Sequence, residues 1–184
     1  MILQGKQVRL RATERDDLPL AVEYLNDPDV LMWFGQPAPL SMDDEIAWYE
    51  RMRQDDSIVN FAIEVEGRYV GGCGLSGINH LHRRAEIGIF VGDRSVWGRG
   101  VGSEAMALLL GYGFDYLNLH RIFLRVFAEN ARAIHVYESL AFRQEGRFRD
   151  AEWRHGRWHD MLYMSVLETE WRQRRSERQQ ADNG

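Results

Sequence analysis

The chain has one cysteine, Cys73, among its 184 residues, so it cannot form an internal disulfide, and nothing indicates an oxidising compartment. It also lacks any apolar run near the roughly 20 residues that a membrane-spanning helix needs. Its first ten residues, MILQGKQVRL, are too short and too polar for a signal peptide. We therefore expect a cytoplasmic protein with no membrane partner.

An excess of basic residues is missing as well. The formal net charge is −5, from 23 Lys and Arg against 28 Asp and Glu, whereas nucleic-acid binders usually present a basic face. We therefore expect no nucleic-acid partner. The six histidines show no metal-site spacing, because His80 and His82 fall in a predicted turn and no H-E-x-x-H helix exists. We expect no bound metal.

What is present suits a globular protein, with 45% hydrophobic and 28% charged residues. A chain of this length is most simply one domain with a real core. We predict a single domain at residues 1–170 and a charged C-terminal tail at residues 171–184, whose end we expect to fray.

Hydrophobic periodicity predicts a mixture of strands and helices. The predicted strands cover residues 8–11 (an edge strand), 60–65, 69–75, 84–91, 121–126, 142–147 and 159–167. The predicted helices begin at Thr13-x-x-Asp16, at the N-cap Ser41, at Ser103 and after Asn130. Turns are expected at Glu66-Gly67 and at His155-Gly156. This order favours an α/β layer with helices on both faces of a sheet, although it does not fix the sheet topology.

Residues 86–102, EIGIFVGDRSVWGRGVG, carry the most informative local pattern. They predict a buried strand, a turn and a glycine-rich loop that leads into a helix. Such a loop gathers unpaired N–H groups at the positive end of a helix dipole, which suits a pyrophosphate. Gly98, Gly100 and Gly102 would let a phosphate approach the main chain. The spacing matches neither the Walker loop nor the dinucleotide fingerprint, so a glycine-rich turn without a ligand stays an alternative.

A second motif, N-x-x-A-x-x-x-Y from Asn130 to Tyr137, accompanies this loop. Together they resemble the GNAT superfamily of acetyl-CoA-dependent N-acetyltransferases, and within it the ribosomal-protein alanine and spermidine N-acetyltransferase branch. The resemblance covers most of the chain and is firmest over residues 78–167. It implies an α/β (α+β) fold with a GNAT-like mixed central sheet flanked by helices on both faces.

Two positions depart from the family pattern. The loop pattern Gln/Arg-x-x-Gly-x-Gly/Ala falls on Trp97 to Gly102, so Trp97 stands where a polar residue is usual. Leu140-Ala141-Phe142 replaces the usual Leu-Gly-Phe. Ala141 must therefore accept the backbone geometry of a glycine, at about 1 kcal/mol if its φ is positive.

The resemblance implies acetyl-CoA as the cosubstrate. The backbone of residues 89–91 would pair with the pantetheine arm, and the amides of residues 99–103 would hold the pyrophosphate. The implied cofactor-binding residues are Ile89, Phe90, Val91, Trp97, Gly98, Arg99, Gly100, Val101, Gly102, Ser103, Asn130, Ala133 and Tyr137. Asn130 has two possible roles, which can coexist: a bond to the pantetheine and the cap of the following helix.

Acetyl transfer to an amine needs an acid that protonates the departing thiolate and a base that takes a proton from the ammonium. Tyr137 is the candidate acid, because it stands where the spermidine branch has its proposed tyrosine acid. The alternative is a tyrosine that only packs its helix. Glu86 is the candidate base, acting through water, and its alternative is a salt bridge to Arg83 or Arg84.

Aromatic faces attract cations, so four aromatic residues are candidate walls of an acceptor pocket alongside Glu86. They are Trp33, Phe34, Trp153 and Trp158. Taken singly, each is more simply a core residue.

We predict an N-acetyltransferase that moves an acetyl group from acetyl-CoA to a primary amine, a small molecule or a protein N-terminus, by direct attack in a ternary complex. Spermidine enzymes tend to carry acidic residues where this chain has Gly35-Gln36 and Ser76-Gly77. A polyamine carries several positive charges and needs carboxylates at its site. Because these positions are neutral here, spermidine is the alternative acceptor rather than the favoured one. A non-catalytic acetyl-CoA-binding module is the other alternative. The resemblance also makes a homodimer plausible.

Overall fold

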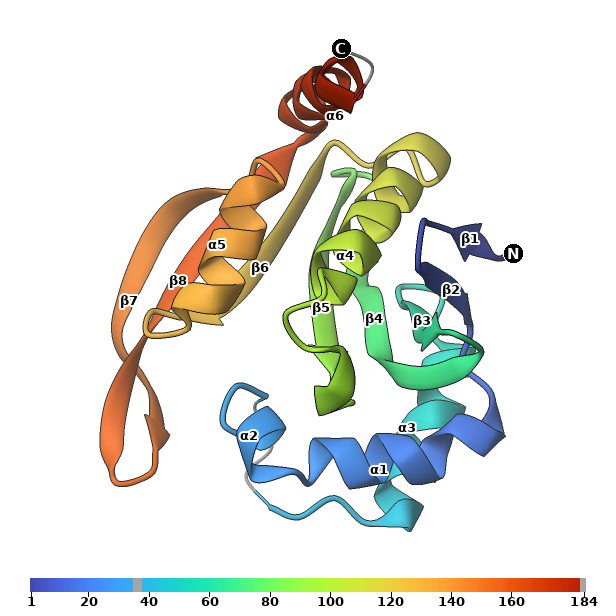
Figure 1. Cartoon of the computed structure of the whole chain (residues 1–184). Helices are drawn as coiled ribbons and strands as arrows, with labels where there is room; N and C mark the ends of the chain where they lie inside the picture. The colour runs from blue at the N-terminus through green and yellow to red at the C-terminus, as the bar shows by residue number, and fades with distance from the viewer. Residues whose placement is uncertain (35–37, 183–184) are drawn as a thin grey trace. The chain divides into compact units, whose positions relative to one another are not determined.

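The computed structural model describes residues 1–34 and 38–182 (Figure 1). The chain divides into two compact units. The first unit comprises Met1–Ile78 and Ile87–Leu109, and the second comprises Asn79–Glu86 and Leu110–Gly184. No helix in the described ranges is both long and apolar enough to cross a bilayer. The prediction of one domain with a tail from residue 171 stays a prediction.

The first unit holds an antiparallel series of strands in the order β1-β2-β3-β4. These strands are β1 (Leu3–Gln4), β2 (Val8–Ala12), β3 (Val59–Val65) and β4 (Arg68–Asn79), whose last residue belongs to the second unit. The predicted hairpin turn is confirmed, since Glu66 and Gly67 have φ values of 52° and 75°, as a two-residue turn requires. The predicted edge position of β2 is wrong, because Leu3 of β1 pairs with Leu10 on its outer side.

Helices of the first unit are η1 (Arg15–Asp17), α1 (Leu18–Leu25), α2 (Pro28–Leu31), α3 (Met42–Gln54), η2 (Arg94–Val96) and most of α4 (Val101–Gly111). Ser41 caps α3 as predicted, since its Oγ accepts from the Asp44 amide at 3.1 Å. The predicted Thr13–Asp16 helix start is displaced by one residue. There, Asp17 accepts from the Glu14 amide at 2.8 Å.

The second unit contains the first residues of β5 (Arg84–Val91), with β6 (Arg121–Phe127), β7 (Arg143–Arg154) and β8 (Arg157–Leu167). They follow the order β5-β6-β8-β7. β5 pairs in parallel with β6 through residues 84–86, and the other pairs are antiparallel. The sheet strands are therefore of mixed direction, and β7 and β8 form a long hairpin (Figure 1).

Helical segments of the second unit are the π-helix η3 (Tyr112–Tyr116), α5 (Ala131–Ser139) and α6 (Glu168–Asp182). The predicted tail is thus helical over its described residues, and Trp171 of α6 is buried and stacks on Phe114 with ring centres 6.4 Å apart. Ala141, directly after α5, has φ of 70°, which confirms that this alanine occupies a glycine-like conformation.

Candidate active site

The structure divides the predicted site residues between the two units. The first unit holds Trp33, Phe34, Ile89, Phe90, Val91 and the loop residues 97–103, and the second holds Glu86, Asn130, Ala133, Tyr137, Trp153 and Trp158.

The glycine-rich loop runs from Trp97 to the start of α4 at Val101. Gly98 and Gly100 have φ values of 77° and 81°, a left-handed conformation that suits glycine. The amides of residues 98 and 100–103 donate no hydrogen bond to any residue that the structure describes. Donors without acceptors at the positive end of a helix are suited to anionic oxygen atoms. The loop, residues 97–103, is therefore suited to phosphate groups, and we call it the phosphate loop.

Trp97, which replaces the usual polar residue, has a clear structural role. Its indole Nε1 donates to the carbonyl oxygen of Val91 at 2.8 Å, and the Arg94 guanidinium carbon lies 5.9 Å from the ring centre. The indole therefore ties the start of the loop to the end of β5. A polar residue is not needed at this position for the loop to be held.

β4 and β5 approach each other unusually closely where β5 ends. A Cβ atom on Gly71 would lie 2.2 Å from the carbonyl oxygen of Phe90, so only glycine fits there. The amides of Gly92 and Asp93 both donate to the carbonyl of Val70, at 2.8 and 3.2 Å. Two successive donors on one acceptor indicate a local irregularity of the ladder, directly before the phosphate loop.

One predicted acceptor-wall residue does lie against the predicted cofactor strand. Phe34 packs edge-on against Phe90, with ring centres 5.5 Å apart. Trp33 is 40% exposed. Gly35 and Gln36, which bear on the choice of acceptor, lie outside the described residues.

In the second unit, Asn130 caps α5. Its Oδ1 accepts from the Ala133 amide at 3.1 Å, so the capping role is present. Tyr137 lies two turns further along, half-buried, with its ring 5.8 Å from that of Phe142. Its hydroxyl makes no hydrogen bond within the described residues of its unit. Burial raises the pKa of Tyr137 to about 12, so the phenol stays protonated at neutral pH and is suited to act as an acid.

Glu86 forms an ion pair, but not with the neighbours that we expected. Its Oε1 accepts from Arg125 Nε at 2.8 Å. Arg83 instead donates to the carbonyl oxygen and the side-chain oxygen of Asn118, both at 2.7 Å. Hydrogen bonding to Glu86 raises the pKa of Arg125. The Glu86 oxygen that accepts from Arg125 is already occupied, so a role for Glu86 in proton removal requires this pair to open.

Trp153 and Trp158 are cross-strand neighbours next to the His155-Gly156 turn of the β7–β8 hairpin. Their rings pack edge-on, with an interplanar angle of 65° and centres 5.2 Å apart, and the residues are 57% and 55% exposed. The structure therefore brings these two predicted wall residues together on the surface of the second unit.

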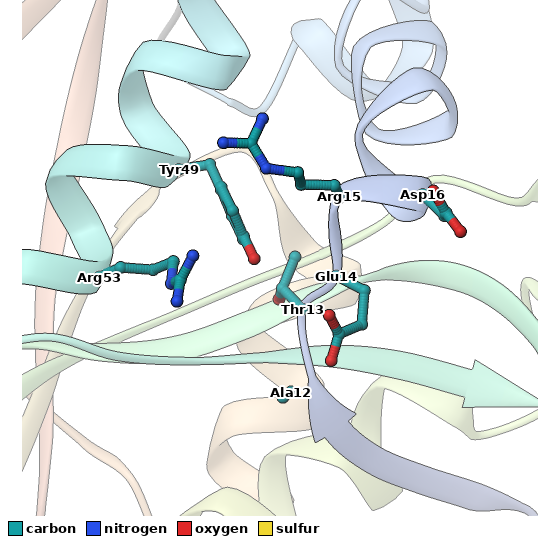
Figure 2. A pocket seen from close by; sticks show the side chains of 7 residues that line it. All are labelled: Ala12, Thr13, Glu14, Arg15, Asp16, Tyr49 and Arg53. Atoms are coloured by element: carbon teal, nitrogen blue, oxygen red, sulfur yellow. The ribbon is translucent and has the colours of Figure 1, made fainter.

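A polar pocket of about 490 Å³ lies in the first unit, away from the phosphate loop in sequence (Figure 2). It is lined by Ala12, Thr13, Glu14, Arg15, Asp16, Tyr49 and Arg53. The guanidinium carbons of Arg15 and Arg53 lie 5.8 and 5.5 Å from the Tyr49 ring centre. None of the predicted site residues lines this pocket.

Three residues that contact the predicted site are not predicted from the sequence: Arg125, Glu104 and Gln7. Arg125 is the partner of Glu86 described above. Glu104, in the first turn of α4, accepts from the amide of Gln7 at 3.1 Å, and the side chain of Gln7 donates to the loop at Arg99. An acid in a first helical turn is a weak local signal, and nothing in the sequence identifies so distant a partner. No group of three or more metal-ligating side chains occurs among residues 1–34 and 38–182.

Comparison with known proteins gives consistent matches. Residues 7–143 match the family model described as an acetyltransferase (GNAT) domain. Spermidine N(1)-acetyltransferase of Escherichia coli K12 is 34% identical over 164 residues, which cover 88% of this chain and 86% of the relative. The uncharacterized N-acetyltransferase p20 of Bacillus licheniformis is 33% identical, over 92% of this chain and 97% of its own length.

The same fold occurs in a solved structure. The crystal structure of spermidine N-acetyltransferase from Vibrio cholerae, in complex with CoA and spermine, matches with a TM-score of 0.85 at 30% identity. The match covers 91% of this chain and 99% of that chain. The predicted fold class, a mixed sheet flanked by helices, is confirmed.

Proposed function

This chain belongs to the acetyltransferase (GNAT) family, and we propose that the amine it acetylates is a small primary amine or a protein N-terminus rather than a polyamine. It is an N-acetyltransferase, and acetyltransferases of this family use acetyl-CoA.

The phosphate loop supports binding of acetyl-CoA in the first unit. Its unpartnered amides at residues 98 and 100–103 fit the two phosphate groups of the pyrophosphate, and the backbone of residues 89–91 would align the pantetheine arm. Asn130 and Ala133, in the second unit, stay predicted cofactor-binding residues. Acetyl-CoA supplies the thioester, and the protein supplies the orientation and the proton transfers.

Two side chains carry the proton transfers in this proposal. Tyr137 keeps its proton at neutral pH and returns it to the departing thiolate. Glu86 takes the proton of the ammonium through a water molecule once Arg125 has moved away.

The scarcity of free carboxylates among the predicted acceptor-binding residues supports a monoamine over a polyamine as the acceptor. Glu86 is the one carboxylate among the predicted acceptor residues, and it already pairs with Arg125 at 2.8 Å. A polyamine carries several positive charges and needs several free carboxylates. Ser76 and Gly77, exposed on β4, are neutral where spermidine enzymes tend to be acidic. Trp33 and Phe34 suit a single ammonium group through their ring faces.

The spermidine relatives favour a second candidate, polyamine acetylation. A direct test measures the release of CoA thiol with spermidine, small primary amines and peptides with free N-termini, using N-acetylated peptides as the control. We expect a higher kcat/KM for a monoamine or peptide than for spermidine. The reverse order would overturn the choice of acceptor, and CoA binding without turnover of any amine would indicate a non-catalytic binding module.

Two finer properties also belong to the proposal. We retain a homodimer and a cytoplasmic location as predictions. Light scattering of the purified chain measures its mass in solution directly, and a mass of one chain would refute the dimer.

A further inference from the structure

The turn between β1 and β2 forms hydrogen bonds with the phosphate loop and with the first turn of α4. Oε1 of Glu104, the fourth residue of α4, accepts from the backbone amides of Lys6, Gln7 and Val8, at 3.1 Å for Gln7 and 3.5 Å for Val8. In the other direction, Nε2 of Gln7 donates to the carbonyl oxygen of Arg99 at 2.9 Å. The turn is therefore bonded both to the loop and to the first turn of the helix that follows it.

Resting on the proposed binding of acetyl-CoA, we propose that Glu104 and Gln7 are positioning residues for its pyrophosphate. They hold the loop in the shape that leaves the amides of residues 98 and 100–103 without protein partners. We call this set of contacts, formed by Gly5–Val8, Arg99 and Glu104, the loop latch.

Charge explains why the latch matters for binding rather than only for packing. Glu104 directly follows Ser103, whose amide belongs to the proposed phosphate-binding set. A free carboxylate beside a bound pyrophosphate would repel it. Hydrogen bonds from three backbone amides to one carboxylate oxygen offset that negative charge. The acid thus anchors the loop at a place where its charge alone opposes the ligand.

Gly5 provides an independent element of the latch. A Cβ atom at this position would lie 2.1 Å from Oε1 of Glu104. The carboxylate is the far end of a flexible side chain, so in Gly5→Ala it moves away rather than unfolding the protein. This substitution therefore opens the latch without touching Glu104 itself.

The test measures CoA affinity of the full chain by titration calorimetry, with melting temperatures recorded to show that each variant is folded. We expect Glu104→Ala and Gly5→Ala each to weaken binding about tenfold, the scale of hydrogen bonds to a charged group. Glu104→Gln keeps an acceptor oxygen and should stay within about threefold of wild type. Because both substitutions remove the same contact, the double variant should bind no more weakly than Glu104→Ala alone.

Glu66→Gln is the matched control. Glu66 contacts the Arg99 side chain at 3.3 Å, so this variant also removes a carboxylate near the loop but leaves the latch intact. It should bind CoA as tightly as wild type or more tightly. The kcat of Glu104→Ala at saturating acetyl-CoA should stay unchanged, and so should its kcat/KM for acetyl-pantetheine, which lacks the pyrophosphate.

Two results would overturn the inference alone: a Glu104→Ala variant that binds CoA as tightly as wild type or more tightly, or a Gly5→Ala variant with unchanged affinity. The first would mean that the charge of Glu104 matters more than its hydrogen bonds. A wild-type protein that binds no CoA would instead overturn the proposed function, and this inference with it.

Discussion

Replacement of Tyr137 by phenylalanine removes one hydroxyl group from a side chain whose ring packs on Phe142. The ring and its packing stay in place, so the fold and the cap of α5 should be unaffected. The change therefore isolates the proposed proton transfer to the departing thiolate.

The pKa of Tyr137 sets the size of the effect. Burial raises it to about 12, and a thiol lies near 8.5, so full proton transfer is uphill by roughly 3.5 pKa units, or about 5 kcal/mol. Without the phenol, water must supply the proton, and because water is a much weaker acid this transfer is uphill by roughly 7 pKa units. If about half of this difference is felt in the transition state, kcat falls about 100-fold when proton transfer limits turnover.

The assay follows thiol release at saturating acetyl-CoA with the best acceptor from the amine panel, and acetyl-CoA affinity is measured in parallel. We expect kcat to fall about 100-fold while the affinity stays within about twofold. Tyr116→Phe is the control, because Tyr116 is an exposed tyrosine in the same unit that stacks on Tyr112.

A Tyr137→Phe variant with unchanged kcat would refute the assignment of the acid, provided that chemistry limits turnover in the wild type. A pre-steady-state burst of thiol release would show that a later step limits turnover. In that case the comparison is made on the burst rate. A variant that loses acetyl-CoA affinity instead would place the hydroxyl in binding rather than in proton transfer.

Three further changes have defined outcomes. Ala141→Gly should stabilise the protein by about 1 kcal/mol in thermal unfolding, because alanine is strained at φ of 70°, whereas Ala131→Gly in α5 should destabilise it. Burial raises the pKa of Glu45, which is 5% exposed, so the native state is penalised as pH rises from the unfolded value through the native one. Glu45→Gln should therefore be more stable than wild type at pH 7, by on the order of 1 kcal/mol, but not at pH 4. Trp97→Phe removes the bond to Val91 and should weaken CoA binding about fivefold in calorimetry, with kcat unchanged.

The sequence predicts local features correctly where short-range chemistry decides the conformation. The turn at Glu66-Gly67 needs two residues with positive φ, and both have it. Asn130 and Ser41 cap the helices that follow them, as their side chains allow. The strain at Ala141 followed from comparison with the usual glycine. These features depend on contacts within a few residues, which a sequence displays directly.

Features set by tertiary pairing were missed. The sequence predicts the start of the first helix at Thr13 and Asp16, one residue early, because both registers fit the capping pattern. Asp17 is selected by Arg11, whose guanidinium bonds both of its oxygens at 2.7 and 2.8 Å. The outer strand β1 has only two residues and little periodicity of its own.

The ion-pair partner of Glu86 at the candidate site is also set by tertiary pairing and is not predicted from the sequence. Arg83 and Arg84 are its basic neighbours in sequence, but alternation along a strand does not bring them to its carboxylate. Parallel pairing of β5 and β6 sets Glu86 opposite Phe123, and Arg125 then lies two residues further along the neighbouring strand, on the same face. That partner requires the strand order, which the pattern of elements left undetermined.

The conformation of the phosphate loop depends both on local sequence and on tertiary contacts. For this reason its motif alone does not distinguish a phosphate-binding loop from a turn without a ligand. Glycines at residues 98 and 100 permit the bend, and they are visible in the sequence. Whether the bend is held with its amides free depends on acceptors and donors far along the chain, since Glu104 meets Lys6 98 residues away. A glycine-rich turn without such support would relax and satisfy its own amides or leave them to water. The β1–β2 turn forms hydrogen bonds with the carbonyl of Arg99 and the side chain of Glu104, and Trp97 donates to the carbonyl of Val91. None of these hydrogen bonds uses the amides of residues 98 and 100–103. A loop that is held by the β1–β2 turn and by Trp97, and that leaves these amides without acceptors, supports the proposed anionic ligand over turn formation alone.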